Sequence, residues 1–408
     1  MDILFVHRSF PAQFRHLAVH LANDSRYRVF AIGSTFARRL SGVDLSTYKV
    51  NERVVDGVHP FARRFEIESR RAEQVLYAAT HLKHGGMAPA VIFCHPGWGE
   101  NLALRDVFPD AIIVSYCEFY YRGSGADIGF DPEFPLLGLD GLVRLRARNA
   151  ATLLALVDSD VGISPTAWQR SLFPAELRPK VHVIHEGIDV ETASPNADAQ
   201  FILPDNGETV RPGDEIITFA ARNLEPYRGY HIFMRALPHI LAARPRARVL
   251  IVGKRGVSYG APPPPGRNWK DIFLAEVADK LDMSRVTFCD ALPYRQFLAM
   301  LQVSRVHVYL TYPFVLSWSM LEAMACECLV VGSDTSPVQE VISHQRNGLL
   351  VPFFSPSDLA RQVIAAAAEP QKYLHLRKEA RRTIVERFDL KKVCLPRWLS
   401  LVPRPPAA

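Results

Sequence analysis

Short apolar runs alternate with amphipathic stretches along most of the chain. Between the first two runs, Phe14, Leu17, Ala18 and Leu21 follow the spacing of a helix with one apolar face. Six runs in the first half are rich in Val and Ile and apolar on both faces, so we expect buried strands there: 2–7, 28–32, 90–94, 111–116, 160–163 and 181–184. Strands and helices in alternation predict a parallel sheet covered by helices on both sides.

The same pattern starts again in the second half of the chain. Residues 232–243 have helical spacing, and the expected strands are 216–221, 247–252, 285–289, 305–310 and 328–333. Between the two series, 190–215 is rich in Pro, Asn, Asp and Gly and reads as a linker with a loop. We therefore predict an α/β protein with two Rossmann-like domains, 1–190 and 191–384. The apolar tail from about 385 to 408 is expected to pack back on the first domain.

Composition agrees with a packed protein of two cores. A chain of 408 residues exceeds what one hydrophobic core normally serves. The composition of 48% hydrophobic and 22% charged residues excludes disordered and fibrous proteins. No stretch approaches the ~20 uncharged apolar residues of a membrane span, which excludes a transmembrane protein. The first residues show no basic leader or cleavage site, so we expect a cytoplasmic location.

The net charge and the cysteines do not by themselves indicate a specific reaction. The formal charge of +6 permits contact with phosphates or with an anionic membrane, and peripheral contact at the inner membrane face is one expectation. The cysteines are scattered in apolar runs without metal-ligand spacing, so we expect them to be reduced and structural: Cys94, Cys117, Cys289, Cys326, Cys328 and Cys394.

The loops after the predicted first strands lack the dinucleotide pattern. HRSFPAQF follows the strand 2–7 and RNLEPYRG follows 216–221, and neither has the GxGxxG spacing of NAD-binding folds. Arg222 ends a strand and Arg228 precedes a helix that opens at Gly229, so both guanidiniums could reach one anion. The plain alternative is that each Arg meets water or a surface carboxylate such as Glu225.

A second anion-binding element lies in TYPFVLSWSMLEAM. Ser317, Trp318 and Ser319 begin a helix, where backbone N–H groups and the helix dipole favour a phosphate. Glu322 follows one turn later and could accept hydrogen bonds from ribose hydroxyls. The Gly/Pro-rich segment 253–271, which opens with Gly253 and Lys254, follows a strand, where ligands of open α/β sheets bind; a plain surface excursion is the alternative.

These stretches carry a family resemblance. SMLEAMACECLVVGSDTSPVQEVI (319–342) resembles the signature of the retaining glycosyltransferases of family 4, and RNLEPYRG (222–229) resembles the basic motif of that family. VIHEGID (183–189) is similar to the end of its N-terminal domain, and LFVHRSFPAQFRHLA (4–18) to the start of a bacterial subgroup. The resemblance covers the whole chain. It implies a GT-B fold of two facing Rossmann-like domains with an interdomain cleft, and metal-independent sugar transfer with retention at the anomeric carbon.

The resemblance also implies roles for individual residues. Arg222 and Arg228 would hold the donor diphosphate, with Arg228 where relatives commonly have Lys, and Glu322 would bind the ribose. The first glutamate of the family's spaced pair is Phe314 here, which removes one expected donor contact. Where relatives often have a His, this chain has Ser-Tyr-Cys-Glu, so Glu118 is a substitute candidate for contact with acceptor or sugar. The implied donor is a UDP- or GDP-linked sugar, used without a cofactor.

The acceptor side is expected in the first domain. CHPGWGE joins His95, Trp98 and Glu100 in a turn after a strand, and 118–135 adds aromatic residues including Tyr120 beside acids. Aromatic rings with carboxylates match the apolar faces and hydroxyl rims of sugars. Loop packing is the alternative. The acceptor could be a glycan, a lipid-linked saccharide, a protein or a small metabolite.

The sequence leaves three other interpretations to compare with sugar transfer. A metal-dependent transferase of the GT-A type would carry Asp-x-Asp at the end of a strand, but Asp158-Ser159-Asp160 precedes one and reads as a turn and helix terminus. A nucleotide-sugar epimerase of similar two-domain build would also hold a nucleoside diphosphate. A catalytically silent binding or scaffolding subunit is the third, because one expected glutamate is absent. Turnover and product analysis separate these from sugar transfer.

Overall fold

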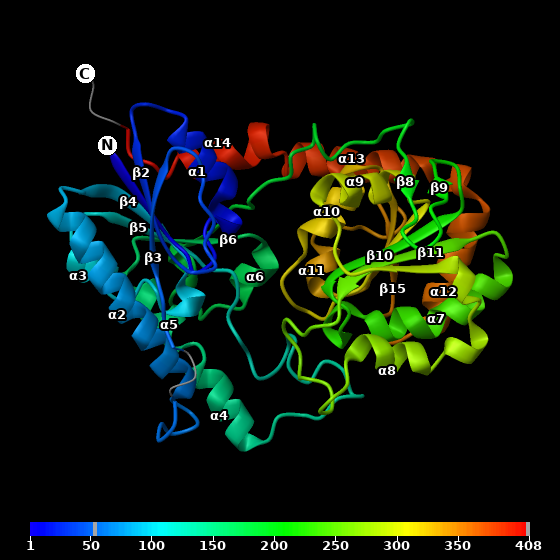
Figure 1. Ribbon diagram of the computed structural model, residues 1–408, viewed down its shortest axis with the longest axis horizontal. Coiled ribbons are helices and arrows are strands. Elements are labelled where there is room, and N and C mark those ends of the chain that lie inside the picture. Colours follow the sequence, from blue (N-terminus) through cyan, green and yellow to red (C-terminus); the bar gives the residue numbers. More distant parts are fainter. Residues whose placement is uncertain (52–54, 405–408) are drawn as a thin grey trace. The chain divides into compact units, whose positions relative to one another are not determined.

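The computed structural model describes residues 1–51 and 55–404 and divides into two compact units (Figure 1). Unit 1 comprises Met1–Gly187 and Leu390–Ala408, and unit 2 comprises Ile188–Asp389. Each unit has its own parallel sheet with helices packed against it, which confirms the predicted α/β class with two Rossmann-like domains. Residues 405–408 of the predicted tail lie outside the described ranges.

Unit 1 is built on a seven-stranded sheet in the order β3-β2-β1-β4-β5-β6-β7, with every pair parallel. Ile3 and Phe5 face one hydrophobic core while Leu4 and Val6 face another, so this central strand is apolar on both sides. The strands are β1 Asp2–Val6, β2 Arg28–Ser34, β3 Val43–Tyr48, β4 Pro89–Cys94, β5 Ile112–Tyr116, β6 Val161–Ser164 and β7 Val181–Val183.

The helices of unit 1 fill the connections between its strands. They are η1 Ala12–Phe14, α1 Arg15–Ala22, α2 Arg63–His84, η2 Pro96–Trp98, α3 Leu104–Val107, α4 Leu139–Ala147, α5 Ala150–Asp158, α6 Ala167–Ser171 and η3 Arg178–Lys180. The chain returns to this unit with the π-helix η8 Leu390–Cys394 and with α14 Leu395–Leu399. Trp398 on α14 is buried beside Tyr116, 6.2 Å between ring centroids, and its Nε1 donates to the His185 carbonyl at 3.0 Å.

Unit 2 has a six-stranded parallel sheet in the order β12-β11-β10-β13-β14-β15, the strand order of a doubly wound nucleotide-binding fold. Its strands are β10 Ile216–Asn223, β11 Arg248–Lys254, β12 Val286–Cys289, β13 Val306–Tyr309, β14 Leu329–Ser333 and β15 Leu349–Val351. Its helices are η4 Pro226–Arg228, α7 Tyr230–Ala243, α8 Trp269–Ala275, η5 Ala278–Lys280, η6 Met283–Arg285, α9 Tyr294–Val303, α10 Trp318–Ala325, α11 Ser336–Gln339, α12 Pro356–Ala368, η7 Pro370–Tyr373 and α13 Leu374–Arg387.

All eleven predicted strands are confirmed, and the strands that the pattern missed are short or half-polar. Strand β3 has the sequence VDLSTY and lies at a sheet edge, where alternate side chains meet solvent and no continuous apolar run is needed. Strand β15 has three residues, and the expected linker contains a small antiparallel pair, β8 Phe201–Ile202 and β9 Thr209–Val210. No helix within 1–51 and 55–404 is both long and apolar enough to cross a membrane.

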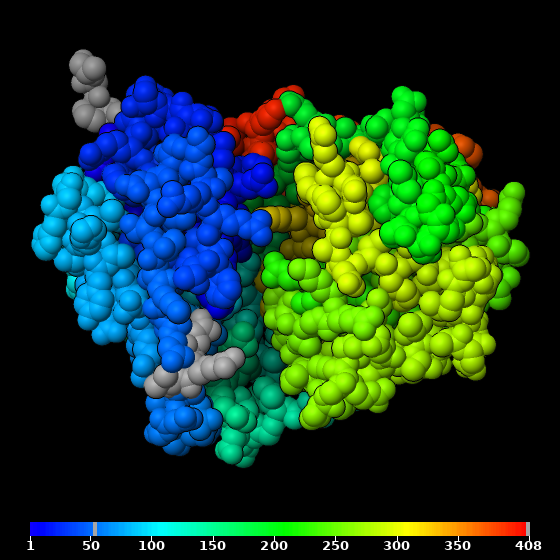
Figure 2. Space-filling view, viewed as in Figure 1, coloured from blue at the N-terminus to red at the C-terminus, as the bar shows by residue number. Residues whose placement is uncertain are grey.

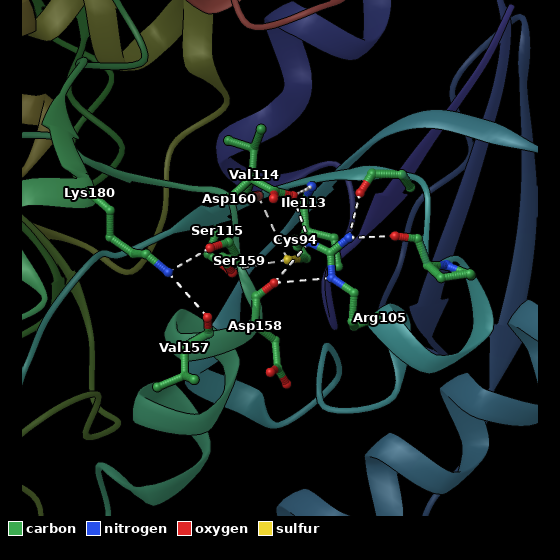
Figure 3. Close-up of polar contacts among 12 residues, drawn as sticks. Cys94, Arg105, Ile113, Val114, Ser115, Val157, Asp158, Ser159, Asp160 and Lys180 are labelled. Atoms are coloured by element: carbon green, nitrogen blue, oxygen red, sulfur yellow. Dashed lines mark hydrogen bonds and ion pairs between the residues drawn. The ribbon is translucent and has the colours of Figure 1, made fainter.

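A polar network joins β5 and β6 of unit 1 (Figure 3). Arg105 donates to the Asp158 carbonyl and, at 2.6 Å, to the Asp160 carboxylate, which also accepts from the Ile113 N–H. Lys180 Nζ donates to the carbonyls of Leu156, Val157 and Ser159, as a cation at a helix C-terminus does. The prediction that Asp158-Ser159-Asp160 is a turn and helix terminus is confirmed, because α5 ends at Asp158.

The six cysteines are free and buried, as expected for reduced structural residues. Burial raises the pKa of the Cys94 and Cys328 thiols to about 12, although hydrogen bonds partly oppose the shift. These thiols therefore remain protonated in the folded protein.

Glu100 is a fully buried carboxyl in unit 1. It accepts hydrogen bonds from the Arg8 N–H at 2.6 Å and from the Tyr48 hydroxyl. Burial nevertheless raises its pKa to about 7, with the hydrogen bonds and nearby cations opposing this. The folded state therefore holds a proton that the unfolded chain releases near the ordinary value of 4.5.

We predict that Glu100→Gln gains stability relative to the wild type as the pH rises. A raised folded pKa stabilises the fold below about 4.5, and this contribution is lost as the pH rises through about 7. Glutamine has no charge to lose, so the difference between the two proteins should change by up to about 3 kcal/mol between pH 5 and pH 8. Thermal unfolding across this range measures it, with exposed Glu73→Gln on α2 as the control. Parallel curves for Glu100→Gln and the wild type would contradict the prediction.

Candidate donor site and acceptor-side cavity

A cavity of about 290 Å³ opens at the carboxyl ends of strands β10 and β11 in unit 2. This is the edge of an open parallel sheet at which ligands bind. It is lined by Ala220, Ala221, Arg222, Val252, Lys254, Asp290, Ala291, Leu292, Phe297, Ser317 and Ser319. Four residues expected to bind the donor are among these, namely Arg222, Lys254, Ser317 and Ser319.

The local fold explains how these four residues meet. Arg222 and Lys254 lie at the ends of the paired strands β10 and β11. Ser317 is the N-cap of α10: its Oγ accepts from the Ser319 N–H at 3.3 Å, and its own N–H donates to the Tyr309 hydroxyl at 2.9 Å. Two cations and the positive end of a helix thus surround one cavity, an arrangement that favours an anion.

Glu225 holds the Gly/Pro-rich loop beside this cavity. It is buried, and its carboxylate accepts from the backbone N–H groups of Ser258, Tyr259 and Gly260 at 3.1 to 3.3 Å. The alternative in which Arg222 or Arg228 pairs with Glu225 as a surface carboxylate is therefore wrong, because Glu225 is buried and binds the loop instead. Packing explains the glycine at position 253, because an added Cβ would lie 2.6 Å from Leu224 Cδ2.

Arg228 is buried outside the lining of the cavity. Its Nη1 donates to Thr311 Oγ1 at 2.8 Å and to the Val315 carbonyl at 3.0 Å. Its guanidinium also lies 5.4 Å from the Tyr259 ring centroid. These contacts tie the segment before α10 to the loop after β10, so Arg228 helps to position the helix start.

Glu322 lies on α10, half-buried, one turn beyond the cavity-lining serines. Burial raises the pKa of its carboxyl, and a hydrogen bond with the Tyr294 side chain acts in the opposite direction. Trp318, the remaining residue expected at this helix start, keeps 43% of its surface exposed and is not in the cavity lining.

Phe314 replaces the glutamate of the resembled family with an aromatic contact. It is buried, and its ring centroid lies 4.7 Å from that of Tyr259 and 5.5 Å from that of Tyr227. Tyr227 in turn packs on Tyr312 at 4.6 Å. The position at which the resemblance implies a glutamate is therefore part of an aromatic cluster.

Unit 1 has a smaller cavity, of about 50 Å³, after strands β4 and β5. Three residues expected on the acceptor side or in catalysis line it: His95, Trp98 and Glu118. Glu118 Oε1 accepts from Gln13 Nε2 at 2.8 Å, and its Oε2 lies 3.6 Å from His95 Nε2. The cavity is also lined by Arg64, Pro96, Gly97, Tyr116, Phe119, Tyr121, Arg148 and Thr152.

Cations gather around Trp98. The guanidiniums of Arg8, Arg64 and Arg71 lie 5.2, 5.3 and 5.7 Å from its ring centroid. Arg148 lies 3.8 Å from the Tyr121 ring centroid and donates to its hydroxyl at 2.8 Å. Sequence reasoning missed Arg64, Arg71 and Arg148 because they come from α2 and from the end of α4, which carry no motif. Arg8 lies in the loop after β1, within the stretch 4–18 that carries the resemblance, but no role was predicted for it.

Two residues expected on the acceptor side are placed elsewhere. Glu100 is fully buried, with its carboxyl hydrogen-bonded to the Arg8 N–H and the Tyr48 hydroxyl, and it does not line the cavity. Tyr120 packs on Phe173, 5.6 Å between ring centroids, and its neighbour Tyr121 lines the cavity instead. The sequence indicated that the turns after these strands lie near the cavity, but it did not indicate which side chains in each turn point into it.

Comparison with known families accounts for both units. Residues 25–193 match the model of the glycosyl transferase family 4 group, and residues 204–383 match that of glycosyl transferases group 1. Curated relatives include D-inositol 3-phosphate glycosyltransferases of Streptomyces bingchenggensis, 26% identical over 47% of this chain and 40% of the relative, and of Jonesia denitrificans, 28% identical over 50% and 47%. The chain thus spans less than half the length of these relatives.

Solved structures share the fold over nearly the whole chain. Sucrose-phosphate synthase of Thermosynechococcus elongatus has a TM-score of 0.70 at 17% identity, with 98% of each chain covered. HepE of Anabaena, in complex with UDP and glucose, has a TM-score of 0.66 at 14% identity, with 98% of this chain and 99% of that one covered. With a glycosyltransferase family model on each unit and this fold, the chain belongs to the family 4 glycosyltransferases of the GT-B fold.

Proposed function

We propose that this protein is a retaining glycosyltransferase that moves a sugar from a nucleoside diphosphate to a hydroxyl acceptor. The cavity of unit 2 carries the proposal, because Arg222, Lys254 and the start of α10 together suit a diphosphate. UDP is the first nucleotide to test, since HepE, which shares the fold, is described in complex with UDP and glucose. GDP is the second.

Breaking the bond between sugar and diphosphate leaves negative charge on the departing oxygen. Fixed cations and N–H groups beside that oxygen would stabilise the transition state more than the ground state. Arg222, Lys254 and the backbone at Ser317–Ser319 would supply this stabilisation without a metal or cofactor. Arg228 would act through the loops that it connects, and Glu322 would bind the ribose.

The acceptor is proposed to bind unit 1 at the cavity lined by His95, Trp98 and Glu118. The His95–Glu118 pair offers hydrogen bonds to a hydroxyl, and the Trp98 and Tyr121 rings line the cavity with guanidiniums against them. Two curated relatives act on a phosphate-bearing acceptor by their names, and Arg64 and Arg148 lie where an anionic group could be held. A cytoplasmic location, with contact to the inner membrane face for a lipid-linked acceptor, belongs to the same proposal.

A nucleotide-sugar epimerase and a silent binding subunit remain the alternatives. Phe314 in place of a glutamate is the observation that favours the silent subunit.

The proposal predicts a nucleotide-dependent rise in melting temperature followed by transfer. Thermal shift with UDP, GDP, ADP and TDP identifies the base, because a ligand that binds only the folded state raises its melting temperature. Incubation with the matching nucleotide sugar and an acceptor should then yield a glycoside of unchanged anomeric configuration by NMR, also in EDTA. An epimerised donor without glycoside, or binding without turnover, would contradict the proposal.

Arg222→Ala should lower turnover by about two to three orders of magnitude, as removal of an oxyanion donor does. Arg248→Ala is the matched control, because Arg248 starts β11 at the opposite edge of the same sheet and pairs with Glu208 at 2.6 Å. Steady-state kinetics with saturating donor measures both variants. Equal rates for Arg222→Ala and the wild type would remove Arg222 from the mechanism.

Glu322→Gln should weaken nucleotide binding and flatten its pH dependence. Burial raises the Glu322 pKa, so the carboxyl gains its proton at a higher pH than an exposed one and then accepts ribose hydroxyls less well. Affinity for the nucleoside diphosphate should therefore fall as the pH is lowered in the wild type. Calorimetry at several pH values, with the matching 2′,3′-dideoxy nucleotide as the control ligand, tests this. The same pH dependence for both nucleotides would refute the ribose contact.

A further inference from the structure

Four large apolar side chains lie exposed within eight residues of unit 1. The exposed fractions are 74% for Leu136, 40% for Leu137, 82% for Leu139 and 42% for Val143. They lie on and just before helix α4, which is at the surface in the lower part of Figure 2. Single exposed leucines are common, but a cluster of this kind marks an interaction surface.

Helix α4 has its polarity reversed. Gly141 and Leu145 are its buried residues and define the face that packs on the unit. At 100° per residue, Leu139 and Val143 point away from that face, where a surface helix is normally polar. The outward face therefore has no folding reason to be apolar.

Basic side chains flank this apolar face. Arg144, Arg146 and Arg148 follow in the same helix turn and just after it, all exposed, against one acid, Asp140. Arg144 and Arg146 have no ion-pair partner within the described part of the chain. Their charge is therefore available to a ligand outside the protein.

We propose that Leu136–Arg148 is a docking element that seats unit 1 on an anionic lipid bilayer. Leu136, Leu137, Leu139 and Val143 would enter the boundary between headgroups and acyl chains, and Arg144 and Arg146 would contact the headgroup phosphates. Apolar burial and basic charge together give the two signals that stable interfacial binding requires. The inference deepens the membrane contact named in the proposed function. Its test does not depend on the transfer reaction, because the element lies outside the cavities described above apart from Arg148.

Charge distinguishes a bilayer from a second copy of the chain. In a symmetric dimer the patch would meet itself and bring the arginines of two copies together, which costs free energy. An anionic membrane surface supplies the opposite charge over the whole patch.

The test is co-sedimentation of the full chain with phosphatidylcholine vesicles, with and without about 30% phosphatidylglycerol as the anionic lipid. Binding should appear with the anionic vesicles. The Arg144→Gln/Arg146→Gln variant should bind them roughly 25-fold more weakly, about fivefold for each charge. The Leu139→Ser/Val143→Ser variant should lose about tenfold or more.

The matched control is Leu154→Ser/Val157→Ser, which removes an exposed Leu and Val from the neighbouring helix α5 and should leave binding unchanged. A far-UV circular dichroism spectrum and a ligand-free melting temperature equal to those of the wild type show that each variant is folded, whatever the fate of the transfer proposal. Equal binding to neutral and anionic vesicles, or no binding to either, overturns the inference. A dimer in sedimentation velocity that only Leu139→Ser/Val143→Ser dissociates identifies a second copy and also overturns it.

Discussion

Convergence of positive charge at one sheet edge is the constraint on which the candidate donor site depends. Arg222 and Lys254 come from the neighbouring strands β10 and β11, and the start of α10 comes from the crossover between β13 and β14. Each is weak alone, because an exposed cation is solvated and a short helix has a small dipole. The strand order brings these groups together. Buried Arg228 holds the segment before α10, and buried Glu225 holds the loop after β11. The site is therefore a property of the doubly wound topology more than of any single motif.

Much of the fold follows from the apolar runs, because strands buried on both faces need them. Strand β3 escaped prediction for the opposite reason: it lies at an edge and is half-polar. The places of Arg222 and Ser317 at the unit 2 cavity were predictable, since strand ends and helix starts are visible in sequence. The places of Arg64 and Arg148 at the unit 1 cavity were not, because α2 and the end of α4 bring them there from distant positions. The direction of a side chain in a turn, as for Tyr120 and Tyr121, depends on the folded backbone and has no periodic signal in the sequence.

The aromatic cluster around Phe314 shows how one substitution changes a site without opening it. Tyr227 and Tyr259 pack against Phe314, so the volume of a carboxylate is taken by rings. Arg228 lies 6.0 Å from the Phe314 ring centroid and keeps its hydrogen bonds to Thr311 and Val315. The loop before α10 is therefore held by packing and by one buried cation, and its shape does not require the missing acid.

Burial of the six cysteines has a practical consequence. Thiol reagents attack the thiolate, and the high pKa values of Cys94 and Cys328, together with the burial of all six cysteines, leave the folded protein without a reactive thiol. A cysteine introduced on the surface would then be the sole target for a maleimide dye or a nitroxide. Site-directed labelling therefore needs no prior replacement of the six cysteines, and either unit could carry a spectroscopic probe.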